Sequence, residues 1–155
     1  MPVQQYASFA LTSTRTTPQE MTAALGIEPD EKDVVRGSRS AVPAHHRWKI
    51  VCRRPGLRLD EQIACVLDRL RPHTGRLAAL AGQLDRREGP GSAVLQIVRR
   101  FHGEDSAHKG GLPETVEAPN LFGWHLDRDI LGFLAATGAV VDVDEYDLTG
   151  GPHAD

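Results

Sequence analysis

The ten residues HHRWKIVCRR, from His45 to Arg54, constrain the fold of this chain more than any other stretch. Side chains alternate between the two faces of a strand, so Trp48, Ile50 and Cys52 would share one face. The opposite face would carry His45, Arg47, Lys49 and Arg53. The stretch therefore predicts a central strand that buries one face and turns the other toward water or an anion.

Every other strand candidate has the same half-polar pattern. The candidates are Tyr6–Thr12, Ser92–Phe101, Leu121–Leu126 and Ala139–Tyr146. A sheet covered by helices on both faces would need continuously apolar strands. We therefore expect an α+β two-layer sandwich, with about five strands in a mixed sheet and helices on one face. Two βαβ crossovers, Tyr6–Cys52 and Leu121–Tyr146, would make this fold ferredoxin-like in part.

Signals for helix starts and ends fill the gaps between these strands. Thr17-Pro18 and Gly26 predict the start and the left-handed end of the first helix. Apolar stripes predict three further helices, over residues 59–72, over residues 77–84, and from Asp127 or Asp129 to Gly138. The polar stretches 28–44 and 103–118 are expected to be loops.

The composition is that of an ordinary globular protein. A chain of 155 residues suits one α+β domain, here placed at residues 1–148, with a disordered tail at 149–155. Cys52 and Cys65 lack metal-binding spacing, which predicts free thiols in a reducing cytoplasm. The net charge of −3 argues against a dedicated nucleic-acid or membrane-surface binder. No stretch approaches the roughly 18 apolar residues of a membrane span, so we expect a cytoplasmic protein.

Two segments of the sequence resemble a bacterial family of unknown function. The first is PQEMTAALGIEPD, a helix that ends in Leu-Gly-Ile-x-Pro, followed by Arg36-Gly37 and the strand that bears Trp48. The second is GWHLDRDILGFLAATGAVVDVDEY, a strand and a helix before an acidic strand ending in Tyr. The likeness spans nearly the whole chain and implies one bacterial α+β domain. The family has no established activity, so the resemblance implies no catalytic residues.

A run of basic residues is the strongest candidate for a binding site. Between Val34 and Leu59 there are seven Arg and Lys side chains and no acidic one. Arginine suits carboxylate and phosphate groups because its guanidinium donates two parallel hydrogen bonds. The predicted binding residues are Arg36, His45, Arg47, Lys49, Arg53, Arg100 and His102. The alternative is a solvated face whose charges are balanced by Asp142, Asp144, Glu145 and Asp147.

Motifs for catalysis and metal binding are missing from the sequence. It contains no HExxH, CxxC, GxSxG or GxGxxG pattern. His45, His102 and His125 would share the outer face of the sheet only if their strands were neighbours. Sheets that bind RNA usually stack its bases on aromatic side chains, and only Tyr6 and Tyr146 could do so here, which argues against nucleic-acid binding. We therefore predict no catalytic residue, no metal and no cofactor.

These patterns favour a non-enzymatic binding or interaction domain. Its basic open face would hold an anionic protein, peptide or small ligand, and a partner that neutralises another bacterial protein is one version of this hypothesis. A homodimer is a further arrangement, because a basic face and an acidic strand can pair between two copies. The alternative function is a small-molecule hydrolase that uses His102, His125 and a carboxylate beneath the loop 103–118.

Overall fold

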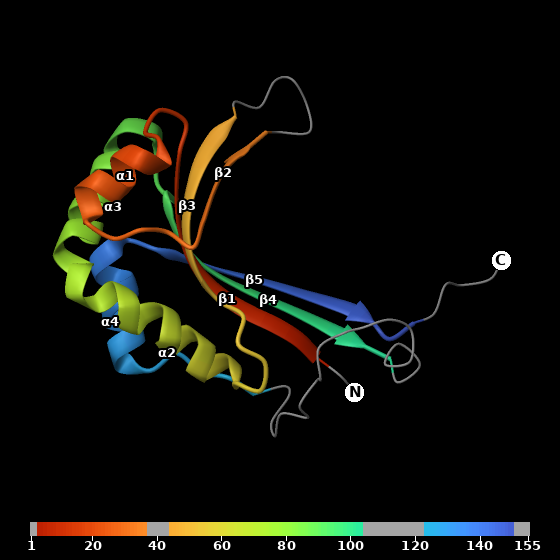
Figure 1. Cartoon of the computed structure of the whole chain (residues 1–155). Coiled ribbons are helices and arrows are strands. Elements are labelled where there is room, and N and C mark those ends of the chain that lie inside the picture. The colour runs from red at the N-terminus through yellow and green to blue at the C-terminus, as the bar shows by residue number, and fades with distance from the viewer. Residues whose placement is uncertain (1–2, 37–43, 104–122, 151–155) are drawn as a thin grey trace.

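A five-stranded sheet with helices on one face forms the frame of the protein (Figure 1). The computed structural model describes residues 3–36, 44–103 and 123–150. The strands are β1 (Val3–Ser13), β2 (Glu31–Val35), β3 (His45–Cys52), β4 (Ala93–His102) and β5 (Val140–Leu148). The α-helices are α1 (Pro18–Leu25), α2 (Leu59–Leu70), α3 (Thr74–Glu88) and α4 (Arg128–Thr137), with a 3-10 turn, Arg71–His73, between α2 and α3. The predicted α+β class with a mixed five-stranded sheet is confirmed.

The strands lie in the order β2-β3-β1-β4-β5, so β1 is central and β2 and β5 are the two edges. β1 pairs antiparallel with both β3 and β4, and β2 pairs antiparallel with β3. β5 runs parallel to β4, which requires the connection that contains α4. Figure 1 shows all four helices on the same side of this sheet.

The core lies between the helices and one face of the sheet. Phe9 pairs with Ile50 on β3 and with Leu95 on β4, and all three side chains are completely buried. Trp48 is also completely buried, and its indole N–H donates a hydrogen bond of 3.1 Å to Thr22 Oγ1 in α1. The predicted inward face of His45–Cys52 is therefore confirmed, whereas its predicted central place in the sheet is wrong, because β1 is the middle strand.

The ends of α1 and α4 follow the local sequence signals. The Thr17 hydroxyl accepts a hydrogen bond from the Glu20 N–H, and the Glu20 carboxylate accepts one from the Thr17 N–H. Asp127 caps α4, because its carboxylate accepts the Ile130 N–H at 2.8 Å. Gly138 ends α4 with a φ of 64°, in the left-handed region that favours glycine. Of the two predicted caps of α4, Asp127 is the correct one.

Strand β2 lies inside the stretch 28–44 that was predicted to be a loop, so that prediction is wrong for Glu31–Val35. The sequence EKDVV begins with three charged residues and lacks an apolar alternation. An edge strand needs only one neighbour, and β2 has β3. Its charged side chains therefore do not prevent it from pairing.

The strand predicted over Leu121–Leu126 is wrong where the structure describes it. Residues 123–127 are irregular, although Trp124 and Leu126 pack against the core. The parallel crossover runs instead from β4 through α4 to β5. The other predicted crossover, Tyr6–Cys52, is also wrong because β1 and β3 are antiparallel. Residues 121 and 122, most of the loop 103–118 and residues 151–155 lie outside the described residues.

The inward valines of β5 are a further correction. Val141 and Val143 pair with the buried Leu95 and Ile97, so they share the helix-side face of the sheet. They nevertheless remain 40% and 42% exposed, because an edge strand has no neighbour on its outer side.

In the described ranges, no helix is long and apolar enough to cross a membrane.

Candidate functional site

One face of the sheet carries none of the described helices and is called the open face below. It holds most of the predicted binding residues. Arg47 and Lys49 alternate with the buried Trp48 and Ile50, so they lie on this face with His45 and Arg53. Arg100 and His102 lie on it from β4. Arg36 is exposed and lies just beyond the end of β2.

These residues do not form one continuous patch. β1 pairs Ser13 with His46 at one end and Val3 with Phe101 at the other. His45 and His102 are therefore just beyond opposite ends of β1, whose two ends are roughly 33 Å apart along the strand at about 3.3 Å per residue. The structure brings Arg53 and Arg100 toward the same end as His102, and leaves Arg36 and His45 at the other end.

The basic side chains on and just after β3 have their acidic partners on β2. Arg47 donates to both carboxylate oxygens of Asp33, through Nε at 2.9 Å and Nη2 at 2.6 Å. This hydrogen bonding is the main reason why the pKa of Arg47 is raised. Lys49 Nζ lies 3.1 Å from Glu31, and Arg53 donates to the same carboxylate.

One of the two interpretations of the basic residues was that acidic neighbours balance their charges. The sequence suggested acidic residues of β5 as these neighbours. For Arg47, Lys49 and Arg53, the structure assigns the role to Glu31 and Asp33 instead. The difference follows from the missed strand β2. Burial alone would raise the pKa of Glu31, yet the hydrogen bonds from Arg53 and Lys49 lower it below its ordinary value.

The middle of the open face is buried, although α1 to α4 all lie on the other face (Figure 1). Lys49 is only 4% exposed, and its ammonium lies 5.5 Å from the centroid of the Tyr6 ring. Ser8, Ala10 and Val98, which lie on the same face, are buried as well. Accessible positive charge on this face is therefore concentrated toward its ends, and Lys49 is part of the folded interior.

One end of the open face carries two stacked arginine–tyrosine pairs. Arg53 Cζ lies 4.7 Å from the centroid of Tyr6, and Arg100 Cζ lies 5.6 Å from that of Tyr146. The pairing of Gln4 with Arg100 makes Arg100 a diagonal neighbour of Tyr6 across the β1–β4 ladder. We call Tyr6, Arg53, Arg100 and Tyr146 the Arg–Tyr corner.

Arg100 differs from Arg47 and Arg53 in its charge environment. In the part of the chain that the structure describes, no carboxylate forms an ion pair with it. The guanidinium carbon of Arg100 lies 5.6 Å from the centroid of the Tyr146 ring, and among the described residues the guanidinium N–H groups form no hydrogen bond to an acceptor. Arg100 is therefore held in position while it keeps the capacity to bind an anion.

Arg99 is a buried cation that the sequence analysis overlooked. It is 2% exposed and lies on the helix-side face, two residues beyond Ile97. Its Nε donates to Gln5 Oε1 at 3.4 Å, and its Nη1 donates to Glu145 Oε1 at 3.0 Å. The alternation of Leu95 and Ile97 could have revealed its inward position. Its partners show that it joins β1, β4 and β5.

The three histidines that were considered for one site, His45, His102 and His125, do not converge. His125 lies outside the strands, where its Nδ1 is 3.3 Å from Asp60 Oδ2 and its backbone N–H donates to Asp60 Oδ1. Asp60 belongs to α2, in the helix layer, whereas His102 is on the open face. Among the described residues, no three His, Cys, Asp or Glu side chains form a group that could hold a metal ion. The arrangement needed for the hydrolase hypothesis is not assembled from these residues.

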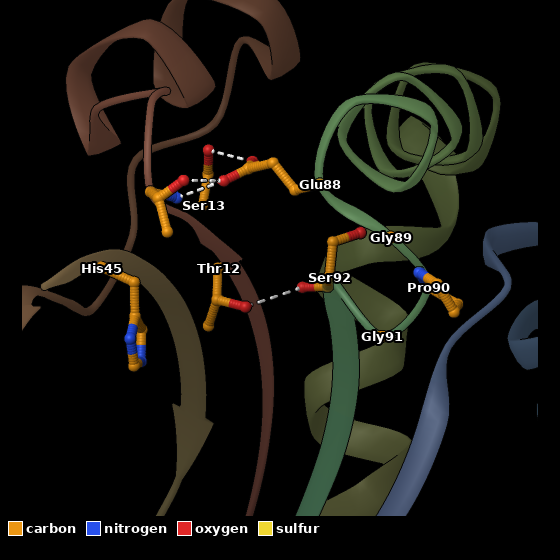
Figure 2. A pocket seen from close by; sticks show the side chains of 9 residues that line it. Thr12, Ser13, His45, Glu88, Gly89, Pro90, Gly91 and Ser92 are labelled. Carbon is orange, nitrogen blue, oxygen red and sulfur yellow. Dashed lines mark hydrogen bonds between the residues drawn. The ribbon is translucent and has the colours of Figure 1, made fainter. Parts of the chain in front are cut away.

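A small pocket of about 210 Å³ lies where β1 meets the turn between α3 and β4 (Figure 2). Its lining residues are Thr12, Ser13, Thr14, His45, Glu88, Gly89, Pro90, Gly91 and Ser92. Glu88 accepts hydrogen bonds from the Ser13 hydroxyl and from the Thr14 N–H, both at 2.5 Å. Burial alone would raise the pKa of Glu88, but these hydrogen bonds lower it.

This chemistry makes Glu88 a structural group. Both of its oxygens are occupied by Ser13 and Thr14, so it stays ionised and fixes the loop after β1 to the end of α3. Figure 2 shows the imidazole of His45 pointing away from Glu88. The two residues therefore do not form an acid–base pair across the pocket.

Comparison with known proteins identifies the family of this chain. Neither the curated proteins nor the solved structures gave a match. The model of one family does match, over residues 3–148, from the first residue of β1 to the last residue of β5. The resemblance to a family of unknown function is therefore confirmed. The chain belongs to the family described as Domain of unknown function (DUF4279).

Proposed function

We propose that this chain is a non-enzymatic interaction domain of the bacterial cytoplasm that holds an anionic partner at the Arg–Tyr corner. The observation that carries the proposal is Arg100, which is stacked on Tyr146 without a carboxylate partner among the described residues. A preordered arginine loses little side-chain freedom when it binds a carboxylate or phosphate. The free thiols of Cys52 and Cys65 suit a reducing compartment.

The basic residues of the open face then divide into two groups. Arg47 and Lys49 form ion pairs within the chain and support the fold. Arg53 has half of its side chain exposed and shares Glu31 with Lys49, so it can contribute to binding beside Arg100. His102 lies two residues beyond Arg100 on the same face, and its buried Nε2 has no hydrogen-bond partner in the described part.

The proposal is tested by titrating the full chain with a dye-labelled peptide of alternating Glu and Ser. We expect the Nε–Hε signal of Arg100 to shift in nitrogen-15 NMR spectra. Loss of one charge-assisted hydrogen-bonding group should weaken the affinity of Arg100→Ala about 10-fold. Arg128→Ala removes an exposed arginine in α4 and is the matched control.

Three results would overturn this assignment. Arg100→Ala could bind the acidic peptide as tightly as the unchanged chain, or the NMR shifts could map to the helix layer. Turnover of an ester or phosphate ester by the full chain would favour the hydrolase hypothesis instead. A dimer that dissociates as salt rises, measured by sedimentation, would support the proposal and identify a second copy as the anionic partner.

A further inference from the structure

We infer that β5 is a docking edge for an extended basic segment of a partner protein, which adds to the sheet as a further strand. This surface is separate from the donor groups of Arg100, and its partner has the opposite charge. The inference rests on three features of β5, namely its unpaired edge, its exposed apolar side chains and its carboxylates.

The edge of β5 is long and unpaired. The strand order places β5 at the end of the sheet, and its 9 residues pair only with β4 in the described part of the chain. Alternate residues of such a strand direct their backbone N–H and C=O groups away from the sheet. These groups can pair with an incoming strand, as in other cases of strand addition.

The side chains of β5 add apolar surface to this edge. Most of the large hydrophobic residues that are exposed in the described chain belong to β5, namely Val140, Val141, Val143, Tyr146 and Leu148. Each of them is between 40% and 47% exposed. A neighbouring strand would cover part of this surface, which favours association through the hydrophobic effect.

The two faces of β5 specify the partner. Val141 and Val143 lie on the helix-side face beside Leu95 and Ile97. Asp142 and Asp144 lie on the open face, and Asp142 forms no hydrogen bond or ion pair in the described part. Opposite residues 141–144, an added strand would therefore need apolar side chains on the helix-side face and basic side chains on the open face. A segment that alternates β-branched and basic residues meets both requirements.

A second copy of β5 fits this edge poorly. Four of its residues are acidic, Asp142, Asp144, Glu145 and Asp147, and only Glu145 forms an ion pair in the described part. Antiparallel pairing of two β5 strands would bring carboxylates of both copies close together. Edge strands use such charges to discourage self-association. A basic partner turns the same charges into attractive contacts.

The test uses the full chain and two capped octapeptides, one alternating Lys and Val and one alternating Glu and Val. We expect the Lys-Val peptide to slow hydrogen exchange at the outward-facing amides of β5, and the Glu-Val peptide to have no effect. Asp142→Asn should weaken binding of the Lys-Val peptide about 3-fold, because the site is exposed. Glu28→Gln removes an exposed carboxylate outside the sheet and is the matched control.

Arg53→Ala separates this inference from the proposed function, because Arg53 follows β3, far from β5, and its loss should leave the affinity for the Lys-Val peptide unchanged. Protection of the outward β5 amides in the free monomer would show that the chain itself covers the edge, and would overturn the inference. A β5-mediated dimer in sedimentation would overturn it in favour of a second copy. Equal binding of both peptides would also contradict it, since the carboxylates would then not select the partner.

Discussion

At the scale of single residues, Lys49 shows how a charged side chain in a half-polar strand becomes structural. Its side chain is 6% exposed, and its ammonium lies 3.1 Å from a Glu31 carboxylate that is 38% exposed. A buried cation that loses its anionic partner retains the full cost of its desolvation. The pair therefore contributes chiefly by avoiding an uncompensated charge, and Lys49 is not available to a ligand.

This role predicts the outcome of a double-mutant cycle. Glu31→Gln should lower the free energy of unfolding by ~1–2 kcal/mol, less than for a completely buried pair because Glu31 is partly exposed. Adding Lys49→Met should recover much of that loss, since the buried ammonium is then removed together with its carboxylate partner. Urea unfolding measures each variant. A double variant that is as unstable as the sum of both single variants would refute this account.

At the scale of elements, the ends of α1 and α4 followed local sequence rules, whereas the edge strands did not. The cap at Asp127 and the left-handed Gly138 depend on residues within one turn of α4. β2 and β5 depend on which neighbour each strand finds, and that neighbour is remote in sequence. A local pattern therefore predicts a helix boundary better than it predicts an edge.

The cap of α4 provides a prediction for an element. Asp127→Ala removes the acceptor of the Ile130 N–H, and it should lower the free energy of unfolding by ~1 kcal/mol. Asp129 lies two residues later, in the first turn of α4, and does not cap the helix, so Asp129→Ala should have a smaller effect. Thermal unfolding followed by circular dichroism checks both. Equal losses would mean that the helix dipole, rather than the cap hydrogen bond, accounts for the stabilisation.

At the scale of the whole molecule, three carboxylates join elements that are far apart in sequence. Asp30 accepts hydrogen bonds from Arg69 of α2 and from the Val51 N–H of β3. Glu31 joins β2 to β3, and Glu88 joins α3 to the loop after β1. Burial opposes ionisation at all three sites, but their hydrogen bonds outweigh it and lower each pKa.

These shifts predict that acid weakens the fold. A carboxyl group whose pKa is lower in the folded state stabilises the fold while it is ionised, and this stabilisation is lost as the pH falls. The loss should begin below the ordinary value of 4.5 for Glu. Urea unfolding at about pH 5 and about pH 3 avoids most histidine titration. Glu31→Gln/Glu88→Gln should lose less stability between these pH values, and an equal loss would contradict the assignment.

The candidate site was only partly predictable from the sequence, because several of its contacts join strands that are remote in sequence. Alternation around Trp48 correctly separated the buried face of β3 from its charged face. It did not reveal that Arg47 meets Asp33, because that contact depends on the strand β2. It also placed Arg100 correctly on the open face, but not its stacking on Tyr146, which depends on the parallel pairing of β5.

The sequence by itself determined the α+β class, the inward face of β3 and the ends of α1 and α4. Each of these depends on side-chain periodicity or on hydrogen bonds within a few residues. Only the tertiary structure decided which charges neutralise one another and which strands form the two edges of the sheet. The partners of these charges and strands lie on strands that are distant in sequence, so no local sequence pattern predicts them.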